Sequence, residues 1–291
     1  MTAPDGLLIV DKPGGMTSHD VVARVRRLAR TRRVGHAGTL DPMATGVLVV
    51  GVGKATRLLG HLALTEKEYS ATIRLGQATD SDDADGAIVA ATPADDVGDG
   101  DLAAAVAALR GEIRQVPPAV SAVKVGGQRA YKLARAGDAP RLEPRAVTVR
   151  EFSVLAVRRQ AGLLDADARV TCSSGTYIRA LARDLGAALG TGGHLTRLRR
   201  TRVGPYREDD ARTLGQLAEA LDVRPLAEAA AAAFPRFDVT AEQAERLAHG
   251  GRLPARGLGE GPAAAFAPDG SFIALVTEEA DVCRPLAVFA P

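Results

Sequence analysis

The segment VGHAGTLDPMATG, residues 34–46, is a loop rich in Gly, Thr and Pro that carries Asp41 directly before Pro42. A carboxylate held in a loop can act as a nucleophile or as a general base. The glycines of this loop permit positive φ angles and a close approach by the backbone of a ligand. An Asp-Pro pair also begins many turns, and spacing alone favours that interpretation. Spacing alone is therefore not enough to assign a catalytic role to Asp41.

Other patterns resemble known sites but lack a required residue. In GVGKAT, residues 51–56, Lys54 is followed by Ala55, and Leu48 stands where a phosphate-binding P-loop needs its first glycine. The acids of DSDDADG, residues 80–86, do not fall at the calcium-binding positions of an EF-hand, so a solvated loop is the default. The five histidines show no metal-ligand spacing. The sequence therefore predicts no P-loop, EF-hand or metal site.

The charges of the chain are nearly balanced, with 37 basic and 35 acidic residues, but they are segregated along it. Six Arg lie within 24–33, and no acid occurs between Asp20 and Asp41. Seven more Arg lie within 179–207 beside the single acid Asp184, whereas eight Asp gather in 80–101. An Arg-rich face is often merely solvated, yet the lack of counter-charges also fits a surface that contacts phosphates. Both interpretations stay open.

Composition limits the class of protein. The chain has 291 residues, 46% of them hydrophobic and 25% charged, which is typical of a globular protein that can bury a sizeable core. Cys172 and Cys283 form no CxxC pair, which excludes a disulfide scaffold and a Cys-based zinc site. The sequence predicts neither a membrane span nor a secretory signal. We therefore expect a cytoplasmic protein.

The helices and strands that must position the loop are predicted from the periodicity of the hydrophobic residues and from turn-forming Gly and Pro residues. Residues 6–13 predict a strand, Thr17–Asp20 predicts a helix start, and residues 47–52 predict a buried strand after the loop. Further strands are predicted at 68–75, 145–157, 166–173 and 194–203, and helices near 56–64 and at 101–110, 176–189, 213–220 and 225–233. The segment 115–128 is predicted as a non-helical connection. Beyond 237, a helix at 240–249 and strands at 262–267, 271–277 and 283–289 predict a small β-rich module.

The loop and its surroundings resemble a known family. GHAGTLDPMATGVL and the upstream LLIVDKPGGMTSHD are similar to the catalytic and N-terminal motifs of the bacterial TruB family of pseudouridine synthases, which modify the T-loop uridine at tRNA position 55. The resemblance continues in order and covers roughly residues 6–205. Its further blocks are GKATRL (53–58), EYSATIRLGQATDSDDADG (68–86), VPPAVSAVKVGGQRAYKLAR (116–135), SSGTYIRALARDLG (173–186) and GGHLTRLRRTRVG (192–204).

This resemblance implies a fold and a domain organisation. The fold is an α+β catalytic domain, residues 1–235, built on a mixed, mainly antiparallel sheet with flanking helices. The tail, residues 236–291, resembles the small RNA-binding module of the PUA type that such enzymes carry, although this match rests mainly on position and strand pattern.

The resemblance also implies roles for individual residues. Asp41 would be the catalytic nucleophile or base, and Arg179 would pair with it and keep it ionised. Tyr69 would stack on a uracil that has been flipped out of the RNA, and His36 would occupy the space that the base leaves. The remaining predicted pocket residues are Tyr177 and Leu198, with Asp83 as a carboxylate that holds the network.

Partners follow from the same resemblance. The T arm of tRNA would be the substrate, with phosphates contacted by Arg24, Arg27, Arg30, Arg197, Arg199 and Arg200. We expect no cofactor, no metal, no membrane, no obligatory protein partner and a monomer. Two other functions remain open. One is a tRNA-binding or folding protein, which would not need the intact Asp41, Tyr69, Tyr177 and Arg179 set. The other is a sister synthase that acts on another RNA site or is guided by RNA.

Overall fold

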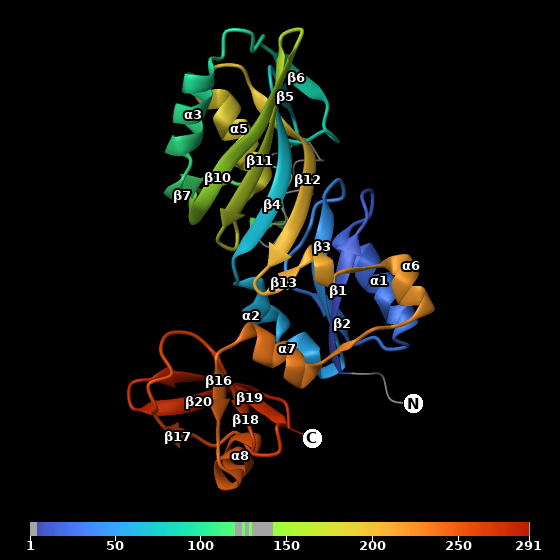
Figure 1. Ribbon diagram of the computed structural model, residues 1–291, viewed down its shortest axis with the longest axis vertical. Coiled ribbons are helices and arrows are strands. Elements are labelled where there is room, and N and C mark those ends of the chain that lie inside the picture. The colour runs from blue at the N-terminus through green and yellow to red at the C-terminus, as the bar shows by residue number, and fades with distance from the viewer. Residues whose placement is uncertain (1–4, 120–123, 126–127, 130–141, 291) are drawn as a thin grey trace. The chain divides into compact units, whose positions relative to one another are not determined.

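The computed structural model describes residues 5–119, 124–125, 128–129 and 142–290 (Figure 1). The chain folds into two compact units. Unit 1 comprises Met1–Pro42, Gly46–Thr65 and Val203–Pro291, and unit 2 comprises Met43–Thr45 and Glu66–Arg202.

The central strands of unit 1 are β1 (Gly6–Lys12) and β3 (Thr45–Val52), which pair antiparallel from Gly6 opposite Val52 to Lys12 opposite Gly46. Both strands are almost entirely buried, which explains why their sequences are continuous apolar runs rather than alternating ones. The short β2 (Val34–His36) pairs with β3. On the other edge of β1 lie β14 (Arg212–Thr213), which is parallel to it, and β15 (Arg224–Pro225), which is antiparallel.

Helix α1 (Ser18–Leu28) begins where the sequence predicts. Thr17 caps it, and the Asp20 carboxylate accepts a hydrogen bond from the backbone of Thr17 in return. Its buried face is apolar, and its arginines lie on the opposite face. The other helices of unit 1 before the tail are the 3-10 helices η1 (Gly53–Arg57) and η2 (Glu208–Asp210) and the α-helices α2 (Leu59–Ala63), α6 (Leu214–Glu219) and α7 (Leu226–Ala233).

The tail forms a sheet of its own within unit 1. Its strands, in the order β16 (Arg236–Asp238), β18 (Ala263–Phe266), β19 (Phe272–Glu279), β20 (Val282–Val288) and β17 (Leu253–Pro254), pack with helix α8 (Ala241–Ala248). Phe266, Phe272 and Phe289 join a core that also holds Leu7 and Val49 of the central strands. The tail is thus β-rich, as predicted, and shares a core with the N-terminal strands.

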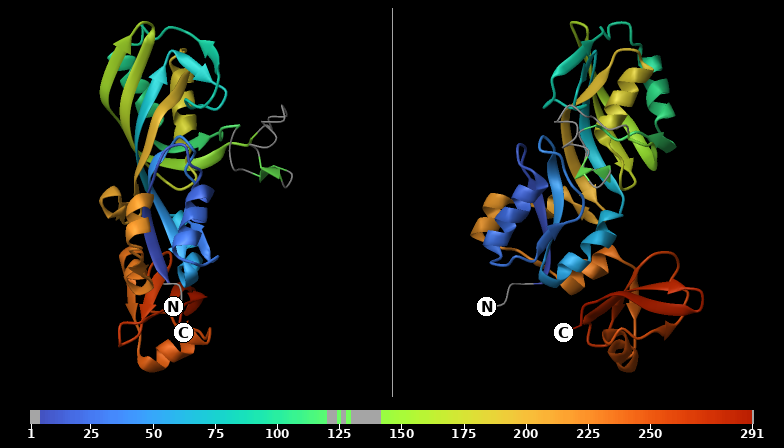
Figure 2. Two further views of the ribbon diagram at one scale, coloured as in Figure 1. Left: turned by 90° about the vertical axis from the view of Figure 1, so that its right-hand side faces the viewer. Right: turned by 180° about the vertical axis from the view of Figure 1, so that it is seen from behind.

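Unit 2 is built on the sheet order β12 (Gly193–Val203), β4 (Lys67–Leu75), β11 (Leu163–Cys172), β10 (Arg145–Gln160) and β7 (Gly111–Gln115). The pairs β4–β11, β11–β10 and β10–β7 are antiparallel. Helices α3 (Asp99–Ala108) and α5 (Ile178–Ala188) cover one face of this sheet (Figure 2). Outward-facing ion pairs such as Arg74–Asp165 and Arg158–Asp167 lie on the strands themselves. The predicted α+β class with a mainly antiparallel sheet is confirmed.

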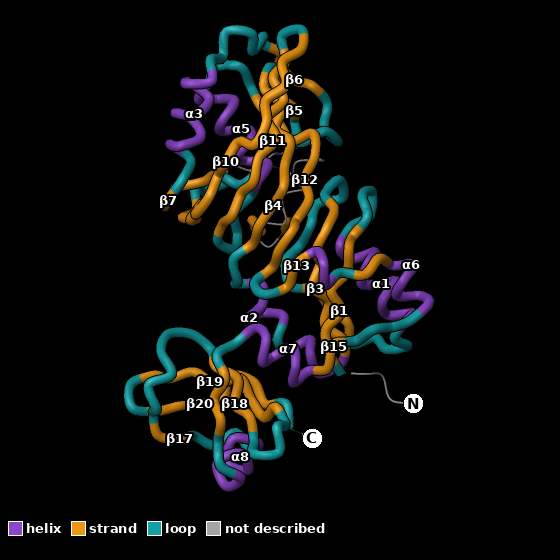
Figure 3. The backbone as a smooth tube through the Cα atoms, in the orientation of Figure 1, coloured by secondary structure: helices purple, strands orange, loops and turns teal. Residues whose placement is uncertain are grey.

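Several short strands were not predicted. They include the hairpin of β5 (Gln77–Thr79) and β6 (Ile88–Ala91), the edge strand β7, and the pairs β8 (Lys124–Val125) with β9 (Gln128–Arg129) and β13 (Tyr206–Arg207) with β12 (Figure 3). Such strands are too short for hydrophobic alternation to reveal them, and β6 is exposed along its whole length. Of the predicted connection 115–128, residues 120–123 and 126–127 lie outside the described residues.

The close approach of α5 to the start of β12 gives a stability prediction. A Cβ added to Gly186 would lie 2.2 Å from the backbone of Gly192 and Gly193, so Gly186→Ala should destabilise the protein by about 2 kcal/mol. Gly100, in the first turn of α3, has no atom within 4 Å of the same added Cβ. Gly100→Ala should therefore leave stability unchanged or raise it by about 0.5 kcal/mol. Urea unfolding of both variants checks this, and equal midpoints would contradict it.

Candidate active site

The loop that carries Asp41 is fixed on both sides of that residue. The Ser18 hydroxyl, at the start of α1, accepts a hydrogen bond from the Leu40 amide at 2.9 Å and donates to the Leu40 carbonyl at 3.1 Å. On the other side, the Pro42 carbonyl accepts hydrogen bonds from the Gly15 amide at 2.9 Å and from Lys12 Nζ at 3.2 Å. Asp41 itself is half-buried. The backbone on both sides of Asp41 is therefore held in place by hydrogen bonds.

Lys12 is the centre of this arrangement. It ends β1 and is 0% exposed, and its ammonium group also donates to the carbonyls of Pro13 and Met16, at 2.8 and 2.6 Å. The turn that brings these carbonyls together contains Gly15, whose φ of 78° lies in the left-handed region that favours glycine. A buried lysine is tolerated when its donors are satisfied, and backbone carbonyls satisfy them here.

His36 ends β2 beside the same loop. Its backbone is set by the register with Val50 of β3, and the next residue, Ala37, donates to the Val49 carbonyl at 2.9 Å. The ring of His36 lies edge-on to the ring of His19, with centroids 5.5 Å apart and planes at 83°. His36 is half-buried and His19 is exposed, so the histidine pair begins at the surface of unit 1.

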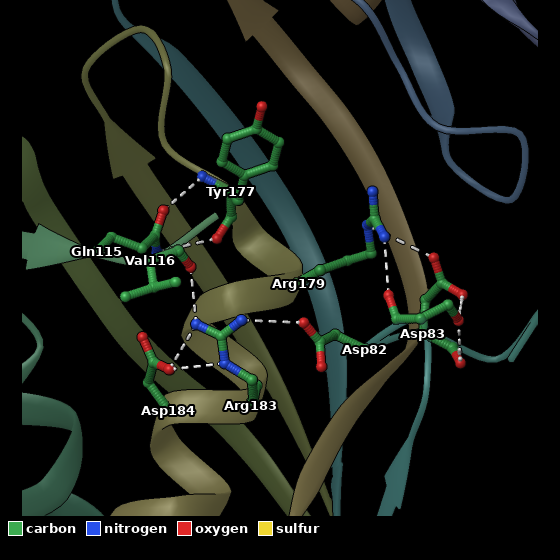
Figure 4. Close-up of polar contacts among 9 residues, drawn as sticks. Asp82, Asp83, Gln115, Val116, Tyr177, Arg179, Arg183 and Asp184 are labelled. Atoms are coloured by element: carbon green, nitrogen blue, oxygen red, sulfur yellow. Dashed lines mark hydrogen bonds and ion pairs between the residues drawn. The ribbon is translucent and has the colours of Figure 1, made fainter. Parts of the chain in front are cut away.

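In unit 2, Arg179 and Asp83 form a buried ion pair (Figure 4). Arg179 Nε lies 3.5 Å from Asp83 Oδ2, and Arg179 Nη1 donates to the Ser81 carbonyl at 2.7 Å. The other oxygen of Asp83 accepts hydrogen bonds from the Ser81 hydroxyl and from the Asp85 amide. Both side chains are almost completely buried, at 4% and 6% exposed. The geometry therefore fixes the guanidinium of Arg179 through the loop 80–86.

A second arginine of α5 holds the same loop. Arg183 lies 3.2 Å from Asp82 and 2.8 Å from Asp184, and it donates to the Val116 carbonyl at 2.8 Å. Burial raises the pKa of the Asp82 carboxyl, although Arg183 and Arg179 act in the opposite direction. Asp82 has a φ of 60°, a left-handed conformation that costs energy for a residue with a side chain. The contacts with Arg183 help to hold that conformation.

Of the predicted pocket residues of unit 2, Tyr177 lies on the same helix as Arg179 and Arg183, at its start. Tyr177 caps the start of α5 and exchanges backbone hydrogen bonds with the Gln115 side chain, at 2.8 and 3.1 Å. Tyr69 on β4 and Leu198 on β12 are buried residues of adjacent strands. Asp41 and His36 belong to unit 1. The structure thus brings Asp83 into contact with Arg179, and His36 into contact with His19.

The arginines that were predicted to contact phosphates differ in their exposure to solvent. Arg24, Arg27 and Arg30 are exposed on or just after α1, and Arg197 is exposed on β12. Arg200 is only 1% exposed, so its prediction as a surface contact is wrong. Side chains alternate along the strand, so Arg200 lies on the same face of β12 as the buried Leu198. In the loop 80–86, Asp83 is buried against Arg179, which agrees with its prediction as a carboxylate that holds the network rather than with a fully solvated loop.

Sequence reasoning missed Lys12, Ser18, Ser81 and Gln115. Lys12 and Ser18 lie in the motif LLIVDKPGGMTSHD, yet their hydrogen bonds to residues 40 and 42 depend on the fold rather than on spacing. Among the described residues, no group of three or more His, Cys, Asp or Glu could hold a metal ion. No helix in the described part of the chain is long and apolar enough to cross a membrane.

Comparison with known proteins adds independent findings. Residues 26–178 match the TruB family pseudouridylate synthase N-terminal domain, residues 179–229 the tRNA pseudouridylate synthase B C-terminal domain, and residues 234–290 the family tRNA Pseudouridine synthase II, C terminal. The tRNA pseudouridine synthase B of Thermobifida fusca is 62% identical over 290 residues, which are 98% of this chain and 99% of that protein. The protein of the same name from Streptomyces griseus is 59% identical and covers 99% of this chain and 98% of its own length.

Solved structures give a consistent result at lower identity. The structure described as a Cbf5-Nop10-Gar1 complex matches with a TM-score of 0.76 and 27% identity, covering 100% of this chain and 87% of that one. The structure of an H/ACA RNP bound to a substrate RNA containing 2′-deoxyuridine matches with a TM-score of 0.73 and 26% identity, covering 98% and 85%.

The position of Lys12 gives a second stability prediction. Lys12→Met removes the buried donor and leaves backbone carbonyls without it, which should lower the free energy of unfolding by about 2 kcal/mol. Lys54 is a matched control, because its ammonium group also donates to backbone carbonyls but is only half-buried and has longer contacts, at 3.3 and 3.5 Å. Lys54→Met should cost less than about 1 kcal/mol. Urea unfolding measures both, and equal losses would refute the role of Lys12.

Proposed function

Because the chain belongs to the TruB family of pseudouridylate synthases, we propose that it converts the T-loop uridine at position 55 of tRNA into pseudouridine. The chain is a pseudouridine synthase and therefore an isomerase, since uridine and pseudouridine contain the same atoms. The observation that carries the tRNA substrate is 62% identity over 98% of the chain with a protein named tRNA pseudouridine synthase B.

The reaction breaks the bond between C1′ of the ribose and N1 of the uracil, rotates the free base and joins C1′ to C5. We propose Asp41 as the reacting carboxylate, either as a nucleophile at C1′ or as a base toward the C2′ hydrogen. The hydrogen-bonded amide and carbonyl of Leu40 and the carbonyl of Pro42 support this role, because they hold the backbone on each side of Asp41. No cofactor is needed for either route.

The target base is stacked inside a folded loop, so it must first be flipped out at a cost of a few kcal/mol. In this proposal His36 fills the space that the base leaves, and Tyr69, Tyr177 and Leu198 hold the uracil. Arg179 supplies a positive charge that keeps the reacting carboxylate ionised, and Asp83 positions Arg179. The buried ion pair supports the last step, since it fixes the guanidinium before substrate binds.

RNA binding beyond the pocket follows from charge at the surface. We assign phosphate contacts to the exposed or half-buried arginines, which set position and salt-dependent affinity rather than sequence preference. These are Arg24, Arg27, Arg30, Arg197 and Arg199. We also propose that residues 236–291 act as a separate PUA-like RNA-binding module beside a catalytic domain of residues 1–235. The enzyme would work as a cytoplasmic monomer without an obligatory protein partner.

A sister synthase guided by RNA is the second candidate, since one matched structure is a Cbf5-Nop10-Gar1 complex and another is an H/ACA RNP bound to a substrate RNA. Sequence identity distinguishes the guided synthase from the stand-alone enzyme. The chain shares 27% of its residues with the Cbf5 structure but 62% with tRNA pseudouridine synthase B, so we favour an enzyme that acts without a guide.

The proposal is tested by mapping pseudouridine in an unmodified tRNA transcript after incubation with the protein alone. Wild type should modify the T-loop uridine, and a transcript with a scrambled T loop should stay unmodified. Asp41→Asn should abolish product while Asp96→Asn, which changes an exposed carboxylate, should not. Equal modification of the scrambled transcript would refute the substrate, and product from Asp41→Asn at the wild-type rate would refute the role of Asp41.

The role of Asp83 gives a separate prediction. Asp83→Asn keeps the shape of the side chain but removes the charge that faces Arg179, so the single-turnover rate should fall about tenfold or more, equivalent to at least about 1.4 kcal/mol. Asp85→Asn changes an exposed neighbour and should keep the wild-type rate. Rapid-quench measurement with saturating enzyme checks this. If both variants react alike, Asp83 does not position Arg179.

A further inference from the structure

Helix α5 begins at a residue that is unusual for a helix start. Its N-cap residue is Tyr177, whose side chain forms no cap hydrogen bond. Ser, Thr, Asp and Asn are preferred at this position, because their oxygens accept hydrogen bonds from backbone amides of the first turn. Thr17 of α1, Thr213 of α6 and Thr240 of α8 follow that preference, and each hydroxyl accepts such a bond. Capping therefore does not explain why a tyrosine begins α5.

The side chain of Gln115 holds the backbone of Tyr177 (Figure 4). Gln115 Oε1 accepts a hydrogen bond from the Tyr177 amide at 2.8 Å, and Gln115 Nε2 donates to the Tyr177 carbonyl at 3.1 Å. That carbonyl also accepts the first hydrogen bond of the helix, from the Leu181 amide at 3.2 Å. Gln115 ends β7 and is only 2% exposed. One side-chain amide thus restrains the peptide groups on both sides of the Tyr177 Cα.

The residue after Gln115 ties the end of β7 to α5 a second time. The Val116 carbonyl accepts a hydrogen bond from Arg183 Nη2 at 2.8 Å, and Arg183 lies further along the same helix. The ring of Tyr177 points away from Gln115, so the hydrogen bonds with Gln115 involve the backbone of Tyr177 (Figure 4). Arg179, in the first turn of α5, is fixed by its own buried ion pair. These contacts set the backbone of Tyr177 relative to the guanidinium of Arg179.

We propose that Gln115 is a positioning residue, whose amide holds Tyr177 in the orientation in which its ring contacts the uracil. This inference rests on the proposed function, in which Tyr177 lines the uracil pocket. The direction of an aromatic ring depends on its side-chain torsions and on the backbone from which they start, and Gln115 fixes that backbone before RNA binds. Because a misplacement of about 1 Å can slow a reaction on the order of 100-fold, holding the ring in place contributes to the rate. Gln115 itself acts through Tyr177 and on no reacting atom.

The first test measures single-turnover conversion of tRNA by Gln115→Met, which keeps the length of the side chain but removes both hydrogen bonds. The rate with saturating enzyme should fall on the order of tenfold. The Kd for tRNA should change by less than about twofold, since phosphate contacts dominate affinity.

Gln216→Met is the matched control for this measurement. Gln216 also accepts a hydrogen bond from the amide of a helix N-cap residue, that of Thr213 at 2.9 Å, but it does so at the start of α6 in unit 1. The control should keep the wild-type rate. A wild-type rate for Gln115→Met as well would overturn the proposal.

A double-mutant cycle separates positioning of the ring from a general loss of structure. Gln115→Met is combined with Tyr177→Ala, which removes the ring, and with Tyr177→Phe, which keeps it. If Gln115 acts through the ring, Gln115→Met should slow the Tyr177→Ala protein by less than about twofold. It should slow the Tyr177→Phe protein about as strongly as it slows wild type. Equal effects in the two backgrounds would overturn the proposal, because structural damage does not depend on the ring.

Amide hydrogen exchange gives a readout that needs no activity. The Tyr177 amide donates to Gln115, whereas the Leu181 amide donates within α5. Gln115→Met should therefore speed exchange of the Tyr177 amide by about tenfold or more and change that of Leu181 less. Unchanged exchange at Tyr177 would show that Gln115 does not hold it.

A second variant serves if Gln115→Met does not fold. Gln115→Glu has nearly the same shape and retains an acceptor for the Tyr177 amide, but it places a carboxylate oxygen against the Tyr177 carbonyl. It should slow conversion and leave tRNA affinity unchanged, and a wild-type rate would again overturn the proposal. A wild-type protein that forms no pseudouridine in tRNA would refute the proposed function and the role of Gln115 with it. An active wild type with an equally active Gln115→Met would refute the role of Gln115 only, so the two failures are distinguishable.

Discussion

The buried guanidinium of Arg179 is the constraint on which the architecture around it depends. An isolated charge inside a protein costs several kcal/mol, so α5 can carry this arginine only if acceptors reach it. Asp83 and the Ser81 carbonyl are those acceptors, and they come from a segment far away in the sequence. The loop 80–86 must therefore fold back onto α5, and the β5–β6 hairpin on either side of it makes that return possible. The left-handed conformation of Asp82 is part of the cost of this path.

The same principle fixes the loop of Asp41 by a different route. There the buried cation is Lys12, which donates to three backbone carbonyls. Because an ammonium group donates in three directions, one side chain can join the end of β1, the turn after it and the backbone after Asp41. In both arrangements a buried cation holds the backbone of a loop that carries a residue proposed for the site.

The sequence predicted most of the long helices and strands, for identifiable reasons. Strands β1, β3, β4 and β12 and helices α1 and α5 have clear periodicity, and their observed bounds differ from the predicted ones by about one or two residues. The hairpin β5–β6 was not predicted because an acidic, exposed segment has no hydrophobic alternation. The loop of this hairpin carries Asp83, which is buried because it forms an ion pair with Arg179 of α5.

Arg200 shows a related limit of sequence reasoning. In composition it belongs with Arg197 and Arg199, and all three were assigned to a phosphate-binding surface. Strand alternation separates them, because Arg200 lies on the buried face with Leu198 while Arg197 is exposed. Near-neutral net charge is equally uninformative, since +2 averages exposed arginines on α1, buried cations in the sheet and an acidic segment that is partly internal.

The burial of Lys67 makes the stability of the folded protein depend on pH. Its pKa is lowered from 10.5 to about 8 in the folded protein, so the folded state disfavours the charge that the unfolded chain carries freely. Unfolded molecules bind more protons between those two values, and stability therefore rises as the pH increases from about 8 to 10.5. At neutral pH the folded protein bears the whole cost, about 3 kcal/mol. The burial of Lys67 therefore makes the free energy of unfolding depend on pH in the alkaline range.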